Sequence, residues 1–310
     1  MEGDVVVIGG GAAGLSAATV LARARRKVTV IDACEPRNAP AQHVHGFLSR
    51  DGMAPAQMLA IGRDEFAGYD GRVVQARATA IEQLGDRGFV VRCDGGPDLT
   101  ARGVVVATGL RDELPEIPDL RERWGVDVLH CPYCHGYEVR DMPLAVLGGD
   151  NRPFTMHQAS LVRQWSSDVV FFPNRITLAA EERTRLTARG IRIVEGAVAG
   201  LVVKEHQLSG VELADGQIVP RSVAFVGPRF VPCDDLLTEL GCATGEDRWV
   251  STDPTGHTSV TGVWAVGNVV DSPAQLINAA SAGTKAGIAL NHFLLEQDVQ
   301  TAVAASPRHR

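Results

Sequence analysis

The stretch DVVVIGGGAAGLSAATVLARARRKVTVIDA, residues 4–33, decides the fold. An apolar β-branched run is followed by a glycine-rich turn, a Leu/Ala pattern at helical spacing, and a second buried run that ends in an acid. In the turn, Gly9 permits a sharp bend, Gly11 lets backbone approach a pyrophosphate, and Gly14 lets the helix pack closely on the sheet. This order of strand, glycines, helix, strand and acid predicts a dinucleotide-binding βαβ unit.

The same unit supplies candidate cofactor residues. Ala12 and Ala13 complete the turn at the helix N-terminus, where backbone N–H groups favour a phosphate anion. Asp32 follows Gly14 by 18 residues, at the end of the second strand, where a carboxylate can accept hydrogen bonds from an adenosine ribose. The alternative is a glycine-rich turn without a ligand, which the full order of elements disfavours.

Composition limits the class of protein. With 310 residues the chain has room for about two domains, and its 45% hydrophobic content is enough to bury a core in each. The formal net charge is -7, with no basic block before the last few residues, which argues against nucleic acid as a partner. There is no signal-peptide pattern, and no apolar run reaches the roughly 20 residues that span a bilayer. We therefore expect a cytoplasmic protein without a membrane partner, whose cysteines do not form a structural disulfide framework.

Further along the chain, residues 144–172 repeat the pattern of strand, glycine turn, helix and strand. Residues 72–93 predict a small β-meander, and 102–109 predict another buried strand. The segment 262–294 predicts a strand, a turn and an Ala-rich helix, and we expect a frayed polar tail after about residue 299. The fold class is therefore α/β, with two Rossmann-like domains.

The stretch HCPYCHGYE, residues 130–138, places Cys131 and Cys134 in a CxxC pair with a histidine bonded to each side. A zinc site needs about four ligands, and the other cysteines make no second close pair. Two inert thiols are a further alternative, but CxxC with flanking histidines is the arrangement that lowers a thiol pKa. We therefore favour a redox pair and expect no metal. The remaining cysteines are Cys34, Cys93, Cys233 and Cys242.

The order of GxGxxG, central ATG, CxxC, second Rossmann unit and C-terminal GVWAVGN resembles the low-molecular-weight thioredoxin reductase family of FAD flavoproteins, over about residues 4–297. The resemblance implies a FAD domain formed by residues 1–114 and 230–310. It implies an inserted NAD(P)H-like domain at 115–229 that carries the CxxC pair. A homodimer is also implied.

The resemblance also assigns cofactor residues. Gly267 and Asn268 occupy the place of the family's Gly-Asp, whose carboxylate bonds the flavin ribityl chain, and asparagine keeps one acceptor there. Residues 37–47 align with the segment over the flavin, which places His43 or His45 near the isoalloxazine. The other positions assigned to FAD are Arg37, Asn38, Thr108, Gly109, Gln275 and Leu276.

Within the family, HCPYCHGYE is most similar to the branch of dithiol oxidases of gliotoxin- and holomycin-type biosynthesis, which close a disulfide in a small product. The resemblance implies that Cys131 exchanges with a dithiol substrate and that Cys134 faces the flavin. Ordinary thioredoxin reductases have an acid directly after the second cysteine, where this chain has His135. A histidine can take and return protons near neutral pH, so His135 is the candidate base and His130 a second one.

The second nucleotide unit departs from the family pattern. Asp150 stands where a glycine should let a pyrophosphate approach, and Pro153 replaces the small residue that packs helix on strand. Arg175 is alone where two or three cations would hold the 2′-phosphate of NADPH. Two such lost contacts, at roughly 1.5 to 3 kcal/mol each, weaken binding by about a hundredfold or more. The alternative is that Arg152 and Arg175 hold NADPH in an altered pose.

These patterns lead to one hypothesis and two alternatives. The first is a dithiol oxidase that passes electrons through FAD to oxygen and gives hydrogen peroxide. The second is a thioredoxin reductase fed by NADPH or ferredoxin, and the third is a non-catalytic flavin redox sensor. The thiols come either from a small-molecule dithiol or from a thioredoxin-like protein.

Overall fold

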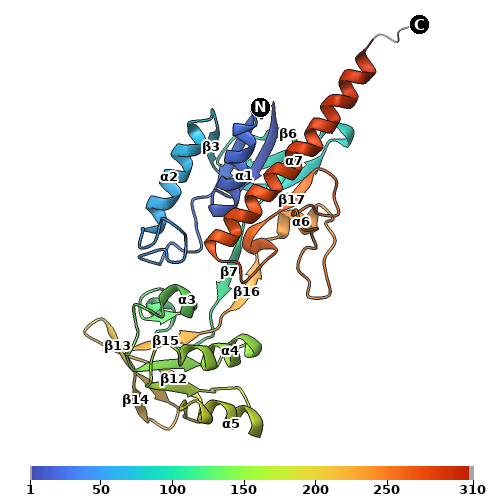
Figure 1. Cartoon of the computed structure of the whole chain (residues 1–310). Helices are drawn as coiled ribbons and strands as arrows, with labels where there is room; N and C mark the ends of the chain where they lie inside the picture. Colours follow the sequence, from blue (N-terminus) through green and yellow to red (C-terminus); the bar gives the residue numbers. More distant parts are fainter. Residues whose placement is uncertain (1, 307–310) are drawn as a thin grey trace. The chain divides into compact units, whose positions relative to one another are not determined.

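The computed structural model describes residues 2–306 and divides into two compact units (Figure 1). Unit 1 contains the chain up to Ala39, Phe47–Arg111 and the chain from Pro232 onward. Unit 2 contains Pro40–Gly46 and Asp112–Val231. Each unit has its own parallel sheet and helices, so the predicted α/β class is confirmed: one Rossmann-like domain is split around an inserted second one that bears the CxxC pair.

Unit 1 is built on a sheet with the order β3-β2-β1-β6-β5-β4, and β17 lies beside β6. In the parallel part, Val5 is the register partner of Val28 on one side and of Gly103 on the other. These strands are rich in valine and isoleucine because helices or loops cover both of their faces. They are β1 (Glu2–Ile8), β2 (Val28–Asp32), β3 (Arg72–Gln75), β6 (Leu99–Val106) and β17 (Val263–Ala265).

The predicted meander at residues 72–93 needs a correction. β3 pairs in parallel with β2 at the edge of the sheet, while β4 (Arg77–Gln83), β5 (Phe89–Asp94) and β6 form the antiparallel part. The alternating pattern finds the strands correctly, but it does not specify the partner of each strand. A short 3₁₀ turn, η1 (Gly85–Arg87), connects β4 to β5.

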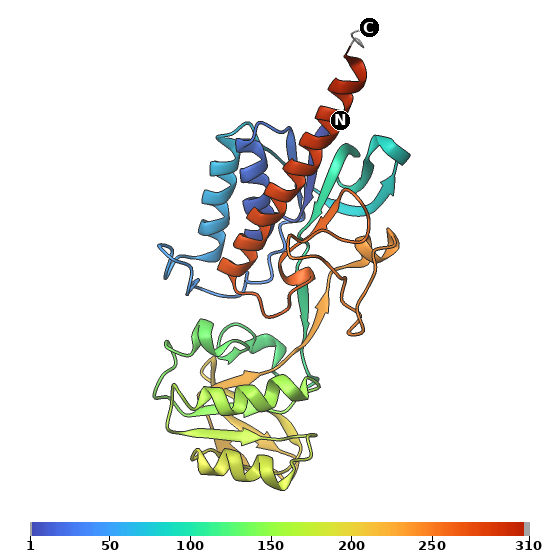
Figure 2. The ribbon, with the colours of Figure 1, turned by 45° about the vertical axis from the view of Figure 1, so that its right-hand side comes forward.

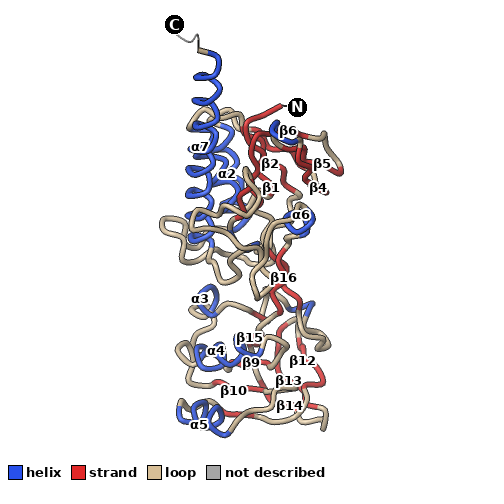
Figure 3. Tube along the Cα trace, turned by 90° about the vertical axis from the view of Figure 1, so that its right-hand side faces the viewer, coloured by secondary structure: helices blue, strands red, loops and turns tan. Residues whose placement is uncertain are grey.

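Three helices lie side by side over one face of this sheet (Figure 2): α1 (Ala12–Arg23), α2 (Pro55–Ala67) and α7 (Leu276–Ala305). The contact of α7 with α1 is close, because a Cβ at Gly283 would lie 2.0 Å from the Ala13 carbonyl oxygen. Figure 3 shows α7 as one continuous helix. The expected frayed tail is therefore wrong for residues 300–305, where the alanines and glutamine favour helix as far as Ala305; residues 307–310 lie outside the described part of the chain.

The core of unit 1 fills both faces of its sheet. Val5 and Trp264 are buried on the face covered by α1 and α7. Val6 and Ile8 are buried on the opposite face, against Leu237. Leu237 belongs to α6, and a 3₁₀ turn, η3, follows β17. Their bounds are α6 (Asp235–Glu239) and η3 (Gly267–Val269).

Unit 2 has a parallel sheet with the order β11-β10-β9-β15-β8, and a separate antiparallel sheet β12-β13-β14. The middle strands of the parallel sheet are fully buried apolar runs. The parallel strands are β8 (Val128–Leu129), β9 (Leu144–Leu147), β10 (Val169–Phe172), β11 (Arg192–Ile193) and β15 (Val223–Val226). The antiparallel strands are β12 (Val198–Lys204), β13 (Gln207–Leu213) and β14 (Ile218–Pro220).

The helices of unit 2 include the short one that positions the CxxC pair. The one-turn α3 (Pro132–His135) follows β8, α4 (Arg152–Val162) connects β9 to β10, and α5 (Ala180–Ala188) follows β10. The order of strands reverses between β9 and β15, and ligands of open α/β sheets bind outside the carboxyl ends of the strands at such a point. A 3₁₀ turn, η2 (Arg121–Arg123), precedes β8.

The chain passes between the units along two paired strands, β7 (Leu110–Glu113) and β16 (Arg229–Pro232). Within residues 2–306, no helix combines the length and the apolar character that crossing a membrane requires.

Candidate cofactor and dithiol site

The glycine turn after β1 has the geometry of a cradle for a phosphate group. Gly9 has φ +106°, and a Cβ there would lie 2.3 Å from the Ala107 carbonyl oxygen. A Cβ at Gly14 would lie 1.9 Å from the Gly9 oxygen, whereas one at Gly11 would meet nothing within 4 Å. α1 begins after Gly11 without a side-chain cap, so no side chain of the described residues caps its first N–H groups, which an anion can bind.

Asp32 places a carboxylate beside this turn. A Cβ at Gly10 would lie 2.4 Å from its Oδ2, so the carboxylate lies directly against the glycines. Its Oδ1 accepts a hydrogen bond from the Cys34 backbone N–H at 3.2 Å, and its Oδ2 lies 4.0 Å from Arg63 Nη1. This position next to the phosphate cradle suits the ribose hydroxyls of a dinucleotide.

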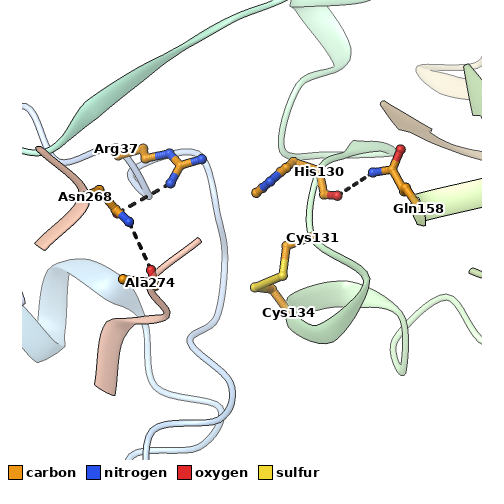
Figure 4. Close-up of a disulfide and its surroundings, with 7 residues drawn as sticks. All are labelled: Arg37, His130, Cys131, Cys134, Gln158, Asn268 and Ala274. Atoms are coloured by element: carbon orange, nitrogen blue, oxygen red, sulfur yellow. Dashed lines mark hydrogen bonds between the residues drawn. A yellow bond between two sulfur atoms is a disulfide. The ribbon is translucent and has the colours of Figure 1, made fainter. Parts of the chain in front are cut away.

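Asn268 connects the C-terminal part of unit 1 to the segment after β2 (Figure 4). Its Oδ1 accepts a hydrogen bond from Arg37 Nη1 at 3.4 Å, and its Nδ2 donates to the Ala274 carbonyl oxygen at 3.1 Å. The same Nδ2 also lies 2.9 Å from the Asp271 carbonyl oxygen. The amide nitrogen therefore holds the loop that leads into α7. An aspartate has no such donor and could not form these hydrogen bonds.

The other predicted cofactor residues of unit 1 lie at turns and element ends. Thr108 Oγ1 donates to the Cys233 carbonyl oxygen at 2.6 Å, and the Cys233 N–H donates to the Gly109 oxygen at 3.0 Å. Gly109 and Gly267 have φ values of +72° and +76°, which favour glycine. Asn38 lies in the turn after Arg37, Gln275 is the N-cap residue of α7 and Leu276 is its first residue.

Taken together, unit 1 contains a glycine cradle, an uncapped helix start and an adjacent carboxylate, and these fit a dinucleotide such as FAD. The residues come from parts of the chain that are distant in sequence, and the parallel sheet brings them into one unit. His45 is the exception, because the structure places it in unit 2.

In unit 2 the CxxC pair forms a disulfide between Cys131 and Cys134, with the two Cα atoms 5.2 Å apart (Figure 4). Cys131 ends the loop after β8, and the single turn of α3 returns the chain so that the N–H groups of Cys134 and His135 both donate to the Cys131 oxygen at 3.1 Å. Cys131 is 8% exposed. In the part of the chain that the structure describes, no three His, Cys, Asp or Glu residues form a metal-binding group.

His130, on the other side of Cys131, is held by packing. Its ring stacks on Phe154 at 5.3 Å between centroids and lies edge-on to Phe230, also at 5.3 Å. Its carbonyl oxygen accepts a hydrogen bond of 2.6 Å from Gln158 Nε2. The backbone next to Cys131 is thus fixed both by aromatic packing and by a buried amide.

His135, the last residue of α3, is half-buried, and charged groups lie near it. Burial lowers the pKa of its imidazole below the ordinary histidine value, the Glu138 carboxylate opposes this shift, and His45 adds to it. His45 Nε2 lies 3.5 Å from Glu138 Oε1, and the His43 ring centroid is 6.2 Å from that of His45. Because its pKa is lowered, His135 is neutral at neutral pH and can accept a proton.

Asn151 caps the start of α4, the helix that follows the glycine turn of the second nucleotide unit. Asn151 Oδ1 accepts a hydrogen bond from the Phe154 N–H at 3.3 Å at the start of α4, and its Nδ2 donates to the Pro228 oxygen at 3.2 Å. The Asn151 side chain thus satisfies one backbone N–H group at this helix N-terminus. Arg152 pairs with Glu182 at 2.8 Å.

Sequence reasoning missed three residues of unit 2: Glu138, Asn151 and Gln158. Asn151 had a usable signal, because asparagine followed two residues later by proline is typical of a helix start. Glu138 and Gln158 had none, since their partners are set by the tertiary fold.

Comparisons with known proteins agree over nearly the whole chain. A model of the pyridine nucleotide-disulphide oxidoreductase family matches residues 3–283. Thioredoxin reductase sirT from Leptosphaeria maculans is 29% identical over 315 residues, covering 96% of this chain and 95% of that protein. The crystal structure of HlmI is 55% identical with a TM-score of 0.94, covering 97% of this chain and 95% of that one. A putative thioredoxin reductase TrxB from Bacillus anthracis is 32% identical with a TM-score of 0.90, covering 95% of this chain and 99% of that one.

Proposed function

The chain belongs to the pyridine nucleotide-disulphide oxidoreductase family, as a thioredoxin reductase-like FAD flavoprotein, and we propose that it is a dithiol oxidase. In this proposal Cys131 and Cys134 close a disulfide in the substrate, and the electrons pass via FAD to oxygen. The net reaction converts one dithiol and one oxygen molecule into one disulfide and one hydrogen peroxide, so atoms and electrons balance.

The observation that carries this proposal is the Asn151 cap at the start of α4. The Asn151 side chain accepts a hydrogen bond from the helix N-terminus, the adjacent Asp150 adds a negative charge, and Arg152 is engaged with Glu182. NADPH would lose the charge-assisted contacts that give it affinity. Without that reductant, electrons enter from substrate thiols and need another acceptor, and oxygen is the simplest one.

The proposed chemistry begins at the disulfide. A substrate thiolate attacks Cys131 Sγ, the Cys131–Cys134 bond breaks, and Cys134 leaves as a thiolate. The second substrate thiolate then attacks the substrate sulfur of the mixed disulfide, which releases Cys131 and closes the product disulfide. FAD, when bound by the residues of unit 1, supplies a two-electron acceptor for the reduced cysteine pair.

We assign proton transfer to His135. Its neutral imidazole can take the proton of the attacking substrate thiol and return it to the thiolate of Cys134. His130 is the second candidate, but its ring stacks on Phe154 and lies edge-on to Phe230, which restricts its movement. We assign His130 chiefly to holding the backbone beside Cys131.

The alternative is a thioredoxin reductase, which is what the similar proteins from Leptosphaeria maculans and Bacillus anthracis are named. NADPH or ferredoxin would then reduce the flavin, and a thioredoxin-like protein would accept electrons from the cysteine pair. The same site could also belong to a flavin redox sensor without steady-state turnover. A homodimer is part of our proposal for the active protein.

One anaerobic titration separates these functions. The FAD-loaded protein is mixed with NADPH, then with dithiothreitol, and then exposed to air while the flavin absorbance is recorded. Bleaching by the dithiol alone, followed by recovery with one peroxide per dithiol, supports the oxidase. Rapid bleaching by NADPH supports the reductase, and a single reduction without repeated turnover supports the sensor.

A further inference from the structure

We infer that Glu138 and His45, whose side chains contact each other at a position three residues beyond His135, act as an opposed pair of positioning residues for the His135 base. This inference rests on the proposed role of His135 in the dithiol reaction. It adds two residues to the site, one of which, Glu138, had no assigned role from the sequence, while the other was expected to contact the cofactor.

The pair is built from two separate parts of unit 2. Glu138 lies three residues after His135, just beyond the end of α3. His45 comes from Pro40–Gly46, a strap that belongs to unit 2. Pro40 anchors the strap against Gly125, where a Cβ would lie 2.6 Å from the Pro40 Cβ.

The geometry makes Glu138 and His45 an ion pair whenever the histidine carries its proton. His45 Nε2 and Glu138 Oε1 are 3.5 Å apart, and their side chains are 21% and 43% exposed. Protonation of His45 therefore neutralises part of the Glu138 field.

The charges that act on His135 can be named. Within residues 2–306, burial is the largest influence on the pKa of His135, and Glu138 and His45 are the charged groups that act on it with opposite signs. Arg140, the next charge along the chain, is held elsewhere: its Cζ lies 4.1 Å from the centroid of the Tyr137 ring, and its Nη1 donates to the Tyr137 oxygen. The His43 ring faces His45, at 6.2 Å.

This arrangement has a chemical use during the exchange step. When the substrate S–H bond breaks and the proton moves to His135, a cation forms on a half-buried side chain, and its partial desolvation costs free energy. The Glu138 carboxylate stabilises that cation until His135 passes the proton to the leaving Cys134 thiolate. His45, when protonated, weakens this stabilisation and keeps His135 from holding the proton too strongly.

The test uses FAD-loaded protein and the anaerobic rate of flavin bleaching by dithiothreitol, measured from about pH 5 to 9. The dithiol is the same throughout, so its own ionisation contributes equally to every variant. Glu138→Gln should move the acid limb of the rate profile to lower pH by about 0.5 to 1 unit, because the variant loses the charge that raises the pKa of His135. The plateau rate should fall severalfold, since a weaker base takes the proton less readily.

His45→Asn should move the same limb in the opposite direction, to higher pH, and the double variant should lie between the two. Glu138→Asp keeps the charge and should restore most of the wild-type profile. A merely structural role would slow the rate without moving the limb in opposite directions. Unchanged limbs in both single variants, or shifts of the same sign, overturn the inference.

His135→Gln separates this inference from the function on which it rests. If that variant keeps the wild-type rate and limb, His135 is not the base and the proposed mechanism fails. If it loses the limb while Glu138→Gln and His45→Asn leave it in place, only the opposed pair fails. Equal FAD content and equal far-UV circular dichroism in all variants confirm that folding is intact.

Discussion

Gln158 Nε2 donates a hydrogen bond of 2.6 Å to the carbonyl oxygen of His130, the residue before the outer cysteine. The same nitrogen lies 3.4 Å from the Val226 oxygen at the end of β15, and the side chain is fully buried. Gln158 therefore ties the ends of β8 and β15 to α4. Cys131 follows His130 directly in the chain. The buried Gln158 amide therefore fixes the backbone position of Cys131.

Gln158→Leu tests this relationship. Leucine fills the space but leaves two buried carbonyl oxygens without this donor, so we expect a loss of about 1 to 3 kcal/mol in the free energy of unfolding. Dithiol-driven flavin bleaching should also slow, because Cys131 loses its support. Urea denaturation and the anaerobic rate provide the measurements. Gln164→Leu is the control, since Gln164 is exposed just after the same helix; equal effects of the two changes would contradict the assignment.

Cys131→Ser and Cys134→Ser should each abolish bleaching of the flavin by dithiols. The flavin should remain bound in both variants, because the expected FAD residues lie in unit 1 and the disulfide lies in unit 2. The visible spectrum and the anaerobic rate check the two parts of this prediction. Cys93→Ser, which removes a thiol of unit 1 outside the CxxC pair, should keep the wild-type rate. Full turnover in the Cys131 variant is incompatible with the proposed exchange.

Asn151→Ala tests the role of the Asn151 cap at the start of α4, in the second nucleotide unit. Loss of the helix cap should cost about 0.5 to 2 kcal/mol of stability, measured by chemical denaturation. Removal of this cap alone should not allow NADPH to bleach the flavin, because Arg152 remains bound to Glu182. The control is Asp150→Ala, which removes an exposed charge and should leave stability unchanged. Strong NADPH bleaching of the wild-type protein would remove the reason for an oxygen-linked reaction.

The sequence was most informative where the relevant contacts are local. The turn at Gly9, Gly11 and Gly14 could be predicted because the three glycines keep a fixed spacing within one βαβ unit, and the structure shows the close approach of Gly14 to the Gly9 oxygen and the open space at Gly11. The CxxC pair is equally local, since three residues and one helical turn bring Cys131 and Cys134 together. For these elements, spacing alone determines geometry.

Features that depend on distant partners could not be predicted in this way. β3 pairs in parallel with β2 at the edge of the sheet. An alternating pattern predicts a strand but does not specify its partner strand. The strap with His45 meets Gly125 and Glu138, which lie about 80 to 90 positions further along the chain. Gln158 looks like an ordinary polar helix residue until the end of β8 is placed beside it.

The lowered pKa of His135 predicts how stability depends on pH. The folded pKa lies below the unfolded value of about 6.5, so the unfolded chain binds this proton first as the pH falls. The free energy of unfolding should therefore decrease as the pH falls through about 6.5 towards the folded pKa, by at most about 1.4 kcal/mol per pH unit for this one group. His135→Gln should remove this component, which denaturation at about pH 7.5 and about pH 5.5 can measure. His292→Gln, at an exposed position on α7, should keep the wild-type dependence. An equal loss in His135→Gln and wild type would show that the pH dependence arises elsewhere.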